Sequence, residues 1–180
     1  MTERTRSLLQ SLKHKRVGLF VDNANWFYPQ QELGWRISFD RLSHLLNASC
    51  YLAPQYLYAG TPLTVAHTER FRAFTDAAAW AGFLVVTKPL KKIWVDRKAG
   101  TFVHKCNFDV EITLDVATRI KDMDVVILGS GDSDFLAVER FARKHKKEFI
   151  ALCFERGIAW EMRQRHHIFL EDLRAEIEKQ

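Results

Sequence analysis

The chain has 180 residues, of which 47% are hydrophobic and 27% charged, as in an ordinary one-domain globular protein. Its apolar runs are too short to span a bilayer, and its charged N-terminal stretch lacks the apolar segment of a signal peptide. The formal net charge of +5 favours an acidic partner only slightly. Three cysteines without metal-type spacing are typical of reduced thiols, so we expect a cytoplasmic protein.

Strands and helices are predicted to alternate along the chain. Apolar, β-branched runs predict strands at residues 16–21, 51–58, 83–87, 125–128 and 148–154. Helical periodicity predicts helices at residues 38–50, from Thr61 and Pro62 to Gly82, at 107–120, 135–144 and 169–179, with a basic helix or turn at 156–165. This alternation predicts an α/β fold: a three-layer α/β/α sandwich with a mainly parallel sheet of about five strands. We expect one domain over residues 1–180, with a core at 16–155 and a C-terminal helical extension.

Asp22 and Asn25 directly follow the first predicted strand. An Asp at this position can simply form an Asx-turn before the next segment. In an open α/β sheet, however, ligands bind outside the carboxyl ends of the strands. A buried strand that delivers Asp22 to that edge favours a functional role.

A basic segment at 88–105 is predicted to form a β-hairpin with a Gly-containing turn. Two aromatic residues, Trp94 and Phe102, are interleaved with its charges. Basic and aromatic side chains together suit phosphate contact with base stacking, yet lysines also protect an exposed edge hairpin from aggregation. On this stretch alone the two interpretations are equally good. The cations are Lys88, Lys91, Lys92, Arg97, Lys98 and Lys105, against one acid, Asp96.

Asp109 lies at the start of the helix predicted at 107–120, so one interpretation is that it simply caps this helix. Asp115 lies further along the same helix. Arg119 follows Asp115 by four residues, so an ion pair between them is expected.

The run 124–135 contains a buried strand, then Gly129-Ser-Gly131, then Asp132 and Asp134 at the start of a helix. Both acids could be capping or dipole-complementing residues. A dinucleotide-binding loop is excluded, because its third glycine would fall at Asp134. Right-handed crossovers place Asp132 and Asp22 on one edge of the sheet, and Asp109 can reach that edge too.

Several carboxylates converging without His or Cys suit a hard cation with oxygen ligands, so Mg²⁺ or Mn²⁺ is the expected cofactor. Such an ion activates water and neutralises charge in phosphoryl displacement. Together with the basic hairpin, the acids predict a metal-dependent nuclease that acts on a polyanion.

Three motifs in order resemble the NYN domain family of the PIN-like ribonuclease superfamily, most closely its LabA-like bacterial members. They are residues 21–25, 105–115 and 129–135, within a similarity that spans residues 16–155. The family usually has a Lys-Gly pair shortly before the helix Asp. Here Lys105-Cys106 stands there with one more residue in the gap, which leaves the role of Lys105 open.

The resemblance implies a ribonuclease whose acidic site acts on RNA, with single strands favoured. The implied catalytic residues are Asp22, Asp109, Asp132 and Asp134, of which the first three would be metal ligands. Asn25, Ser130 and Asp115 would support them. The implied nucleic-acid contacts are Lys91, Lys92, Trp94, Arg97, Lys98 and Lys105.

Two other functions remain open on the sequence. One is an RNA-binding or regulatory protein with this fold but little cleavage, because function depends on the site rather than the fold. The other is a small-molecule phosphohydrolase, which commonly needs a second Asp two residues after the first; that position is Ala24. A homo-oligomer or a protein partner is also left open.

Overall fold

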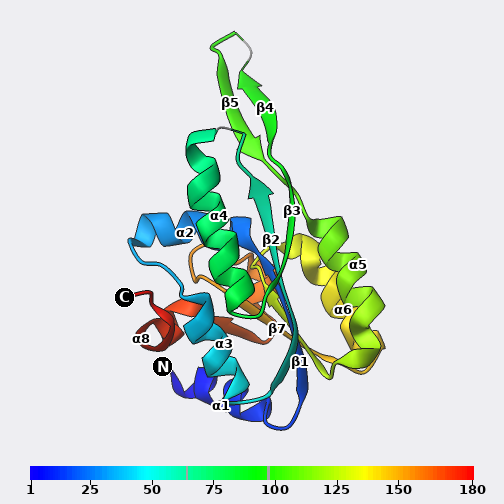
Figure 1. Ribbon diagram of the computed structural model, residues 1–180. Coiled ribbons are helices and arrows are strands. Elements are labelled where there is room, and N and C mark those ends of the chain that lie inside the picture. Colours follow the sequence, from blue (N-terminus) through cyan, green and yellow to red (C-terminus); the bar gives the residue numbers. More distant parts are fainter. Residues whose placement is uncertain (64, 97) are drawn as a thin grey trace.

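The computed structural model describes residues 1–63, 65–96 and 98–180, and within them six strands form one parallel sheet (Figure 1). The strand order is β3-β2-β1-β6-β7-β8. The strands are β1 (Arg16–Asp22), β2 (Tyr51–Thr61), β3 (Leu84–Pro89), β6 (Val125–Gly129), β7 (Glu148–Cys153) and β8 (His167–Phe169). β1 and β6 are adjacent and in register, with Val21 opposite Gly129. The two acidic loops that follow them therefore emerge side by side.

Helices cover both faces of the sheet, which confirms the predicted α/β/α sandwich (Figure 1). One face packs against α1 (Glu3–Ser11), α2 (Asn23–Leu33), α3 (Phe39–Asn47), α4 (Val65–Trp80) and α8 (Arg174–Ile177). The other packs against α5 (Asp109–Arg119), α6 (Leu136–Lys144) and α7 (Trp160–Arg163). Short 3₁₀ turns are η1 (Ile120–Asp122), η2 (Ser133–Phe135) and η3 (Leu170–Leu173). In the described part of the chain, no helix is long and apolar enough to cross a membrane.

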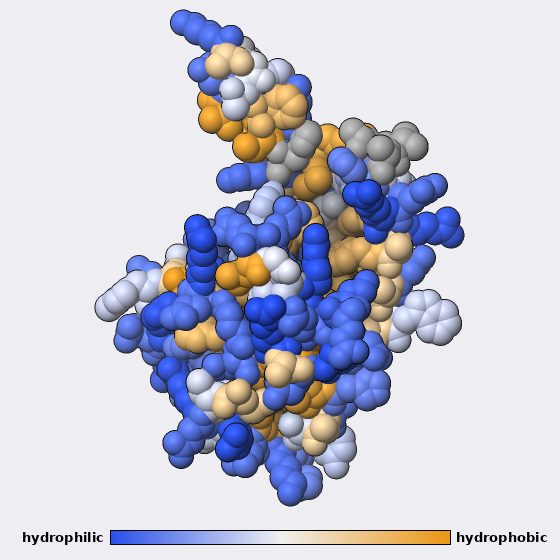
Figure 2. All heavy atoms as spheres, turned by 90° about the vertical axis from the view of Figure 1, so that its left-hand side faces the viewer, coloured by the Kyte–Doolittle hydropathy of each residue, from blue (hydrophilic) through white to orange (hydrophobic). Residues whose placement is uncertain are grey.

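The predicted hairpin is present as β4 (Lys91–Asp96) and β5 (Thr101–Lys105), an antiparallel pair that projects away from the sandwich (Figures 1 and 2). Its base is fixed at Leu90, whose backbone N–H donates to the Thr61 carbonyl (3.1 Å). A Cβ at Gly60 would lie only 2.5 Å from the Leu90 side chain, so the chain packs closely there. Figure 2 shows hydrophobic side chains among hydrophilic ones on this projection.

Two predicted boundaries are wrong. Thr61 does not begin a helix: it ends β2, opposite Pro89 of β3, and the helix begins at Val65. Pairing with β3 keeps this segment extended despite its helix-start sequence. The predicted helix at 169–179 is instead divided: His167–Phe169 pairs with β7 as the sixth strand, and η3 and α8 follow. The C-terminal segment is thus part of the sheet and not only a helical extension.

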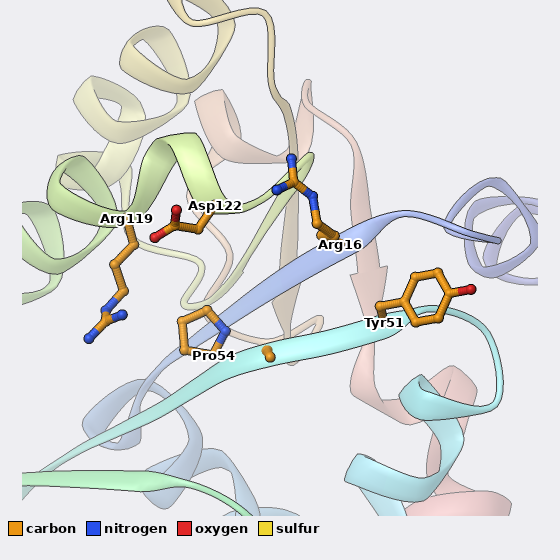
Figure 3. A pocket seen from close by; sticks show the side chains of 6 residues that line it. Arg16, Tyr51, Pro54, Arg119 and Asp122 are labelled. Carbon is orange, nitrogen blue, oxygen red and sulfur yellow. The ribbon is translucent and has the colours of Figure 1, made fainter.

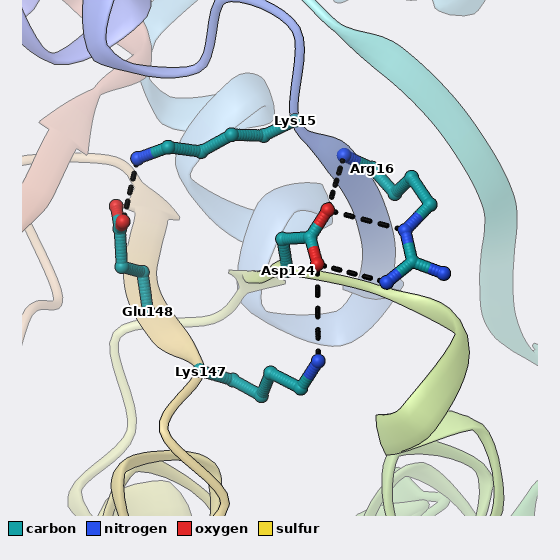
Figure 4. A network of polar contacts seen from close by, with 5 residues as sticks. All are labelled: Lys15, Arg16, Asp124, Lys147 and Glu148. Atoms are coloured by element: carbon teal, nitrogen blue, oxygen red, sulfur yellow. Dashed lines mark hydrogen bonds and ion pairs between the residues drawn. The ribbon is translucent and has the colours of Figure 1, made fainter.

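A charged network holds the amino ends of the strands together (Figure 4). It lies opposite the acidic edge, by which we mean the carboxyl ends of β1 and β6 with Asp22 and Asp132. Asp124 accepts two hydrogen bonds from the Arg16 guanidinium (2.8 and 3.1 Å) and one from the Arg16 backbone N–H (3.0 Å). Lys147 lies 3.8 Å away, and Lys15 pairs with Glu148. Hydrogen bonds from Arg16 lower the pKa of Asp124 to about 2.

We expect Asp124→Asn to destabilise the fold at neutral pH by at most about 1 kcal/mol, because the network is largely exposed and screened. A lowered pKa stabilises the folded state above the unfolded value of about 3.9, and this stabilisation is lost as the pH falls through about 2. The urea midpoint of Asp124→Asn, measured from pH 2 to 7, should therefore fall further below that of wild type as the pH rises. The exposed Glu69→Gln is the control; a difference that does not change with pH would contradict the network.

Candidate functional site

Asp22 is the buried member of the predicted acidic site. It is the last residue of β1 and the N-cap of α2, and it is 8% exposed. Its carboxylate accepts hydrogen bonds from the Asn25 side-chain amide (3.0 Å) and the Ala24 backbone N–H (3.1 Å). Burial raises the pKa of Asp22, and the negative charges of Asp109 and Asp132 raise it further, against the effect of the two hydrogen bonds. The charges of Asp109 and Asp132 therefore act on the Asp22 carboxylate.

The predicted supporting residues Asn25 and Ser130 hold the two strand-end loops together. The Asn25 side-chain oxygen accepts from the backbone N–H of Gly131 (3.3 Å), so one amide contacts both Asp22 and the loop after β6. Ser130 is fully buried, and its hydroxyl oxygen accepts from the N–H of Asp132 (3.2 Å). Both side chains orient the acidic loops.

Asp132 and Asp134 are exposed at the end of this loop. The Asp132 carboxylate caps the 3₁₀ turn η2 by accepting from the N–H of Asp134 (3.0 Å). The capping interpretation thus holds for Asp132, yet its charge also acts on Asp22. Asp134 faces solvent beside it.

Asp109 is the first residue of α5, but it is not the cap: Phe108 occupies that position. Asn107 fixes the carboxylate, because its side-chain amide donates to Asp109 (2.7 Å) and its oxygen accepts from the Asp109 N–H (2.7 Å). Sequence reasoning did not select Asn107. Its position two residues before an acid at a helix start is the signal that identifies it.

The expected ion pair between Asp115 and Arg119 is absent from the described residues. Asp115 instead accepts a hydrogen bond from the hydroxyl of buried Tyr58 (2.8 Å), and burial with this contact raises the pKa of Tyr58. The Arg119 guanidinium lies over the Tyr56 ring, 5.5 Å from its centroid. Tyr58 and Tyr56 of β2 thus contact Asp115 and Arg119 in place of the expected ion pair. Asp115 anchors α5 to β2 below the acidic edge.

An oxygen-rich donor set suits a hard cation such as Mg²⁺. The raised pKa of buried Asp22 beside two other acids shows a carboxylate whose charge is unfavourable, and a cation would relieve it. Within residues 1–63, 65–96 and 98–180, however, no three His, Cys, Asp or Glu side chains are grouped as metal ligands. A shared ion on Asp22, Asp109 and Asp132 therefore stays a prediction.

Lys88 and Glu111 were not among the predicted site residues. Lys88 lies near the carboxyl end of β3, where it pairs with Glu111 of α5 (2.6 Å), and its ammonium lies 4.6 Å from the centroid of the Phe108 ring. Burial raises the pKa of the nearby Cys106 thiol, on which the charges of Lys88, Glu111, Lys91 and Asp22 also act. The base of the hairpin therefore lies close to the acidic edge.

The hairpin brings five of its six predicted nucleic-acid contacts to exposed positions: Lys91, Lys92, Trp94, Lys98 and Lys105. Trp94 lies opposite Phe102, and the Lys92 ammonium lies 4.0 and 3.8 Å from the centroids of these two rings. Trp94 is 43% exposed, so it is not buried against the sheet. Lys91 and Lys105 are directly opposite one another. Lys98 lies in the turn, where its N–H donates to Asp96, and Arg97 lies outside the described residues.

A surface pocket of about 370 Å³ lies at the other edge of the sheet (Figure 3). Residues at the beginnings of β1 and β2 line it, together with Arg119 and Asp122. It contains none of the predicted catalytic acids, so it plays no part in the candidate site.

We expect Asp22→Asn to raise the melting temperature at neutral pH. A raised pKa favours the folded state only while the group is protonated, below the unfolded pKa of about 3.9, and this contribution is lost as the pH rises through the folded value. The advantage of the variant should therefore grow with pH above about 4. Melting curves from pH 3 to 8 measure it, with exposed Asp122→Asn as the control; equal pH dependence in Asp22→Asn and wild type would contradict the raised pKa.

Comparisons with known proteins identify the family and the fold of this chain. A family model described as the NYN domain matches residues 16–173. The low amplitude and bright protein LabA of Synechococcus elongatus is 30% identical over 173 residues, which cover 94% of this chain and 91% of LabA. A crystal structure of a Vibrio parahaemolyticus protein of unknown function has the same fold, with a TM-score of 0.73 at 24% identity over 92% of this chain and 97% of that one. The chain therefore belongs to the NYN domain family, in its LabA-like branch.

Proposed function

We propose that this protein is a metal-dependent ribonuclease that cleaves phosphodiester bonds at the carboxyl ends of β1 and β6. The NYN family includes nucleases. The observation that carries the proposal is the position of the buried Asp22 carboxylate at the end of β1, beside the loop after β6 that carries Asp132. Burial raises the pKa of Asp22, and the charges of Asp109 and Asp132 raise it further. Capping of α2 accounts for the hydrogen bond from Ala24 to Asp22, but not for the nearby charges of Asp109 and Asp132, whose repulsion of Asp22 opposes folding.

In this proposal Asp22, Asp109 and Asp132 hold Mg²⁺ or Mn²⁺, with Asp134 beside them. When bound, such an ion lowers the pKa of water and offsets charge that develops on the phosphate. The residues around the acids position them. Asn25 fixes Asp22 against the loop after β6, Ser130 fixes the backbone of Asp132, and Asn107 fixes Asp109. Three side chains from separate segments of the chain thus orient the carboxylates before any substrate arrives.

The hairpin supplies the contacts to RNA in this proposal. Lys91, Lys92, Lys98 and Lys105 are exposed, and the pair Lys91–Lys105 places like charges opposite one another, which costs stability unless an anion compensates. We infer that the RNA is single-stranded, because the aromatic residues on the hairpin can stack on unpaired bases. We place this activity in the cytoplasm, because Cys50, Cys106 and Cys153 are all free thiols.

One observation favours a second candidate, an RNA-binding regulatory protein without physiological cleavage. In the part of the chain that the structure describes, the acids are not grouped as a ready metal site. Cleavage assays with divalent ions distinguish this candidate from the nuclease.

We expect Asp22→Asn to abolish Mn²⁺- or Mg²⁺-dependent cleavage of a single-stranded oligoribonucleotide while RNA binding is retained or strengthened, because one charge that repels phosphate is removed. The measurement compares cleavage products and binding for each variant. Asp122→Asn, an acid at the opposite edge, should cut like wild type.

Asp115→Asn should reduce cleavage less than Asp22→Asn, since Asp115 binds Tyr58 rather than the other acids. If Asp22→Asn and wild type cut equally, the activity comes from another site or a contaminant. If purified wild type binds RNA and never cuts it with either ion, the regulatory candidate is supported instead.

We expect replacement of Lys91 and Lys92 by Ala to weaken binding of all RNA sequences alike, because phosphate contacts position a strand without specifying it. Each lost phosphate contact should make the slope of log K against log salt shallower by about 0.7 for single strands. Titrations at several salt concentrations measure both effects. Exposed Lys13 and Lys144, replaced by Ala, are the matched control; an unchanged slope in the hairpin variant would leave the hairpin only an edge-protecting role.

A further inference from the structure

Trp160 is an exposed aromatic residue that no structural role explains. It begins α7, and it is 72% exposed, although tryptophan is usually well buried. Met162, two residues later, is fully buried in the core. Residues two apart on a helix point in nearly opposite directions, so the indole of Trp160 points away from the core.

The segment before Trp160 is tied to the acidic loop. The N–H of Ala159 donates to the carbonyl of Gly131 (2.9 Å). A Cβ at Gly131 would lie 2.8 Å from the Cα of Ile158, so the two backbones are in direct contact. Trp160 therefore stands beside the loop that carries Asp132.

A second exposed aromatic residue, Tyr28, comes from α2. Asn25, Tyr28 and Glu32 recur at helical spacing and share one face. Asn25 binds Gly131 (3.3 Å) and Glu32 pairs with Arg156 (3.1 Å), so this face is directed toward both loops. Tyr28, 59% exposed, lies between these two contacts.

The strand order separates Trp160 from the hairpin. The hairpin follows β3, the acids Asp22 and Asp132 follow β1 and β6, and Trp160 follows β7. With strands about 4.8 Å apart, the β3 and β7 ends are separated by four intervals, or about 19 Å. A strand of RNA that crosses the acids from the hairpin therefore reaches the side of Trp160.

Electrostatics favour stacking over phosphate contact on that side. The two arginines nearest to Trp160 in sequence are paired with acids: Arg156 with Glu32 and Arg163 with Glu155. Aromatic rings bind bases without needing positive charge, and every base has a face that can stack. Affinity beside the acidic loop can thus come from rings.

We propose that Trp160 and Tyr28 provide a stacking subsite for unpaired bases of single-stranded RNA on the β7 side of the acidic edge, with α7 and α2 presenting the two rings from opposite faces of the sheet. This inference rests on the proposed ribonuclease function and specifies its substrate class: an unpaired segment long enough to reach from the hairpin to Trp160. A paired helix keeps its bases stacked on one another and cannot use the subsite.

The test measures binding of a single-stranded oligoribonucleotide and of the matching duplex, with a chelator present so that the RNA stays intact. Trp160→Ala should weaken single-strand binding about tenfold, with the salt slope and duplex binding unchanged. Tyr28→Ala should weaken it in the same way, and Trp160→Phe, which retains a ring, should bind nearly like wild type. Trp80→Ala is the matched control, because Trp80 is 91% exposed at the far end of α4 and should have no effect.

Melting temperatures show whether each variant is folded. If Trp160→Ala does not fold, Tyr28→Ala still tests the subsite independently. Unchanged single-strand binding in Trp160→Ala and Tyr28→Ala, with weaker binding in the Lys91 and Lys92 variant, overturns the subsite and leaves the proposed function standing. Equal losses for single strand and duplex also overturn it. If wild type binds no RNA of either kind, the proposed function fails together with the subsite.

Discussion

The site depends on the parallel pairing of β1 with β6. Val21 and Gly129 are opposite one another, so the chain reverses direction at two adjacent points and delivers Asp22 and Asp132 to one place. The contact is close: a Cβ at Gly129 would lie 2.9 Å from the Cα of Val21 and 2.9 Å from the Trp26 ring. Any larger residue would separate the strands, and the two acids would move apart with them.

The polar residues around this pairing serve mainly to orient acids. Asn25 contacts both loops, while Ser130 and Asn107 each fix the backbone or carboxylate of one acid. These hydrogen bonds, partly buried at Asn25 and Ser130 and exposed at Asn107, favour the charged carboxylates and the loop backbones and so offset part of the repulsion between the acids. The fold tolerates an unfavourable charge at Asp22 because the core on both faces of the sheet supplies the stability.

The sequence predicts the sheet well, because buried parallel strands are continuous apolar runs that end in polar residues. It also predicts that Asp22 and Asp132 lie at or just after the carboxyl ends of β1 and β6, as the structure has them, while their role as a metal site stays a prediction. It fails where tertiary pairing decides the conformation. His167–Phe169 becomes a strand only because β7 offers an unpaired edge, and Thr61 stays extended because β3 lies beside it. Asp115 illustrates the same limit: spacing suggests Arg119, while the fold brings the hydroxyl of Tyr58, 57 residues away in sequence, within 2.8 Å.

Trp26 has a consequence for how any ligand must approach. Its indole N–H donates to the carbonyl of Leu152 (3.0 Å), so α2, the helix that Asp22 caps, is bound to β7 across the intervening β6. This bond is buried, and opening the edge would leave both groups without a partner in an apolar core. The protein therefore presents a pre-organised surface, and adjustment falls to the ligand. A flexible polymer can adapt to such a surface at little cost. A stiff polymer binds less tightly, because bending it to fit costs free energy.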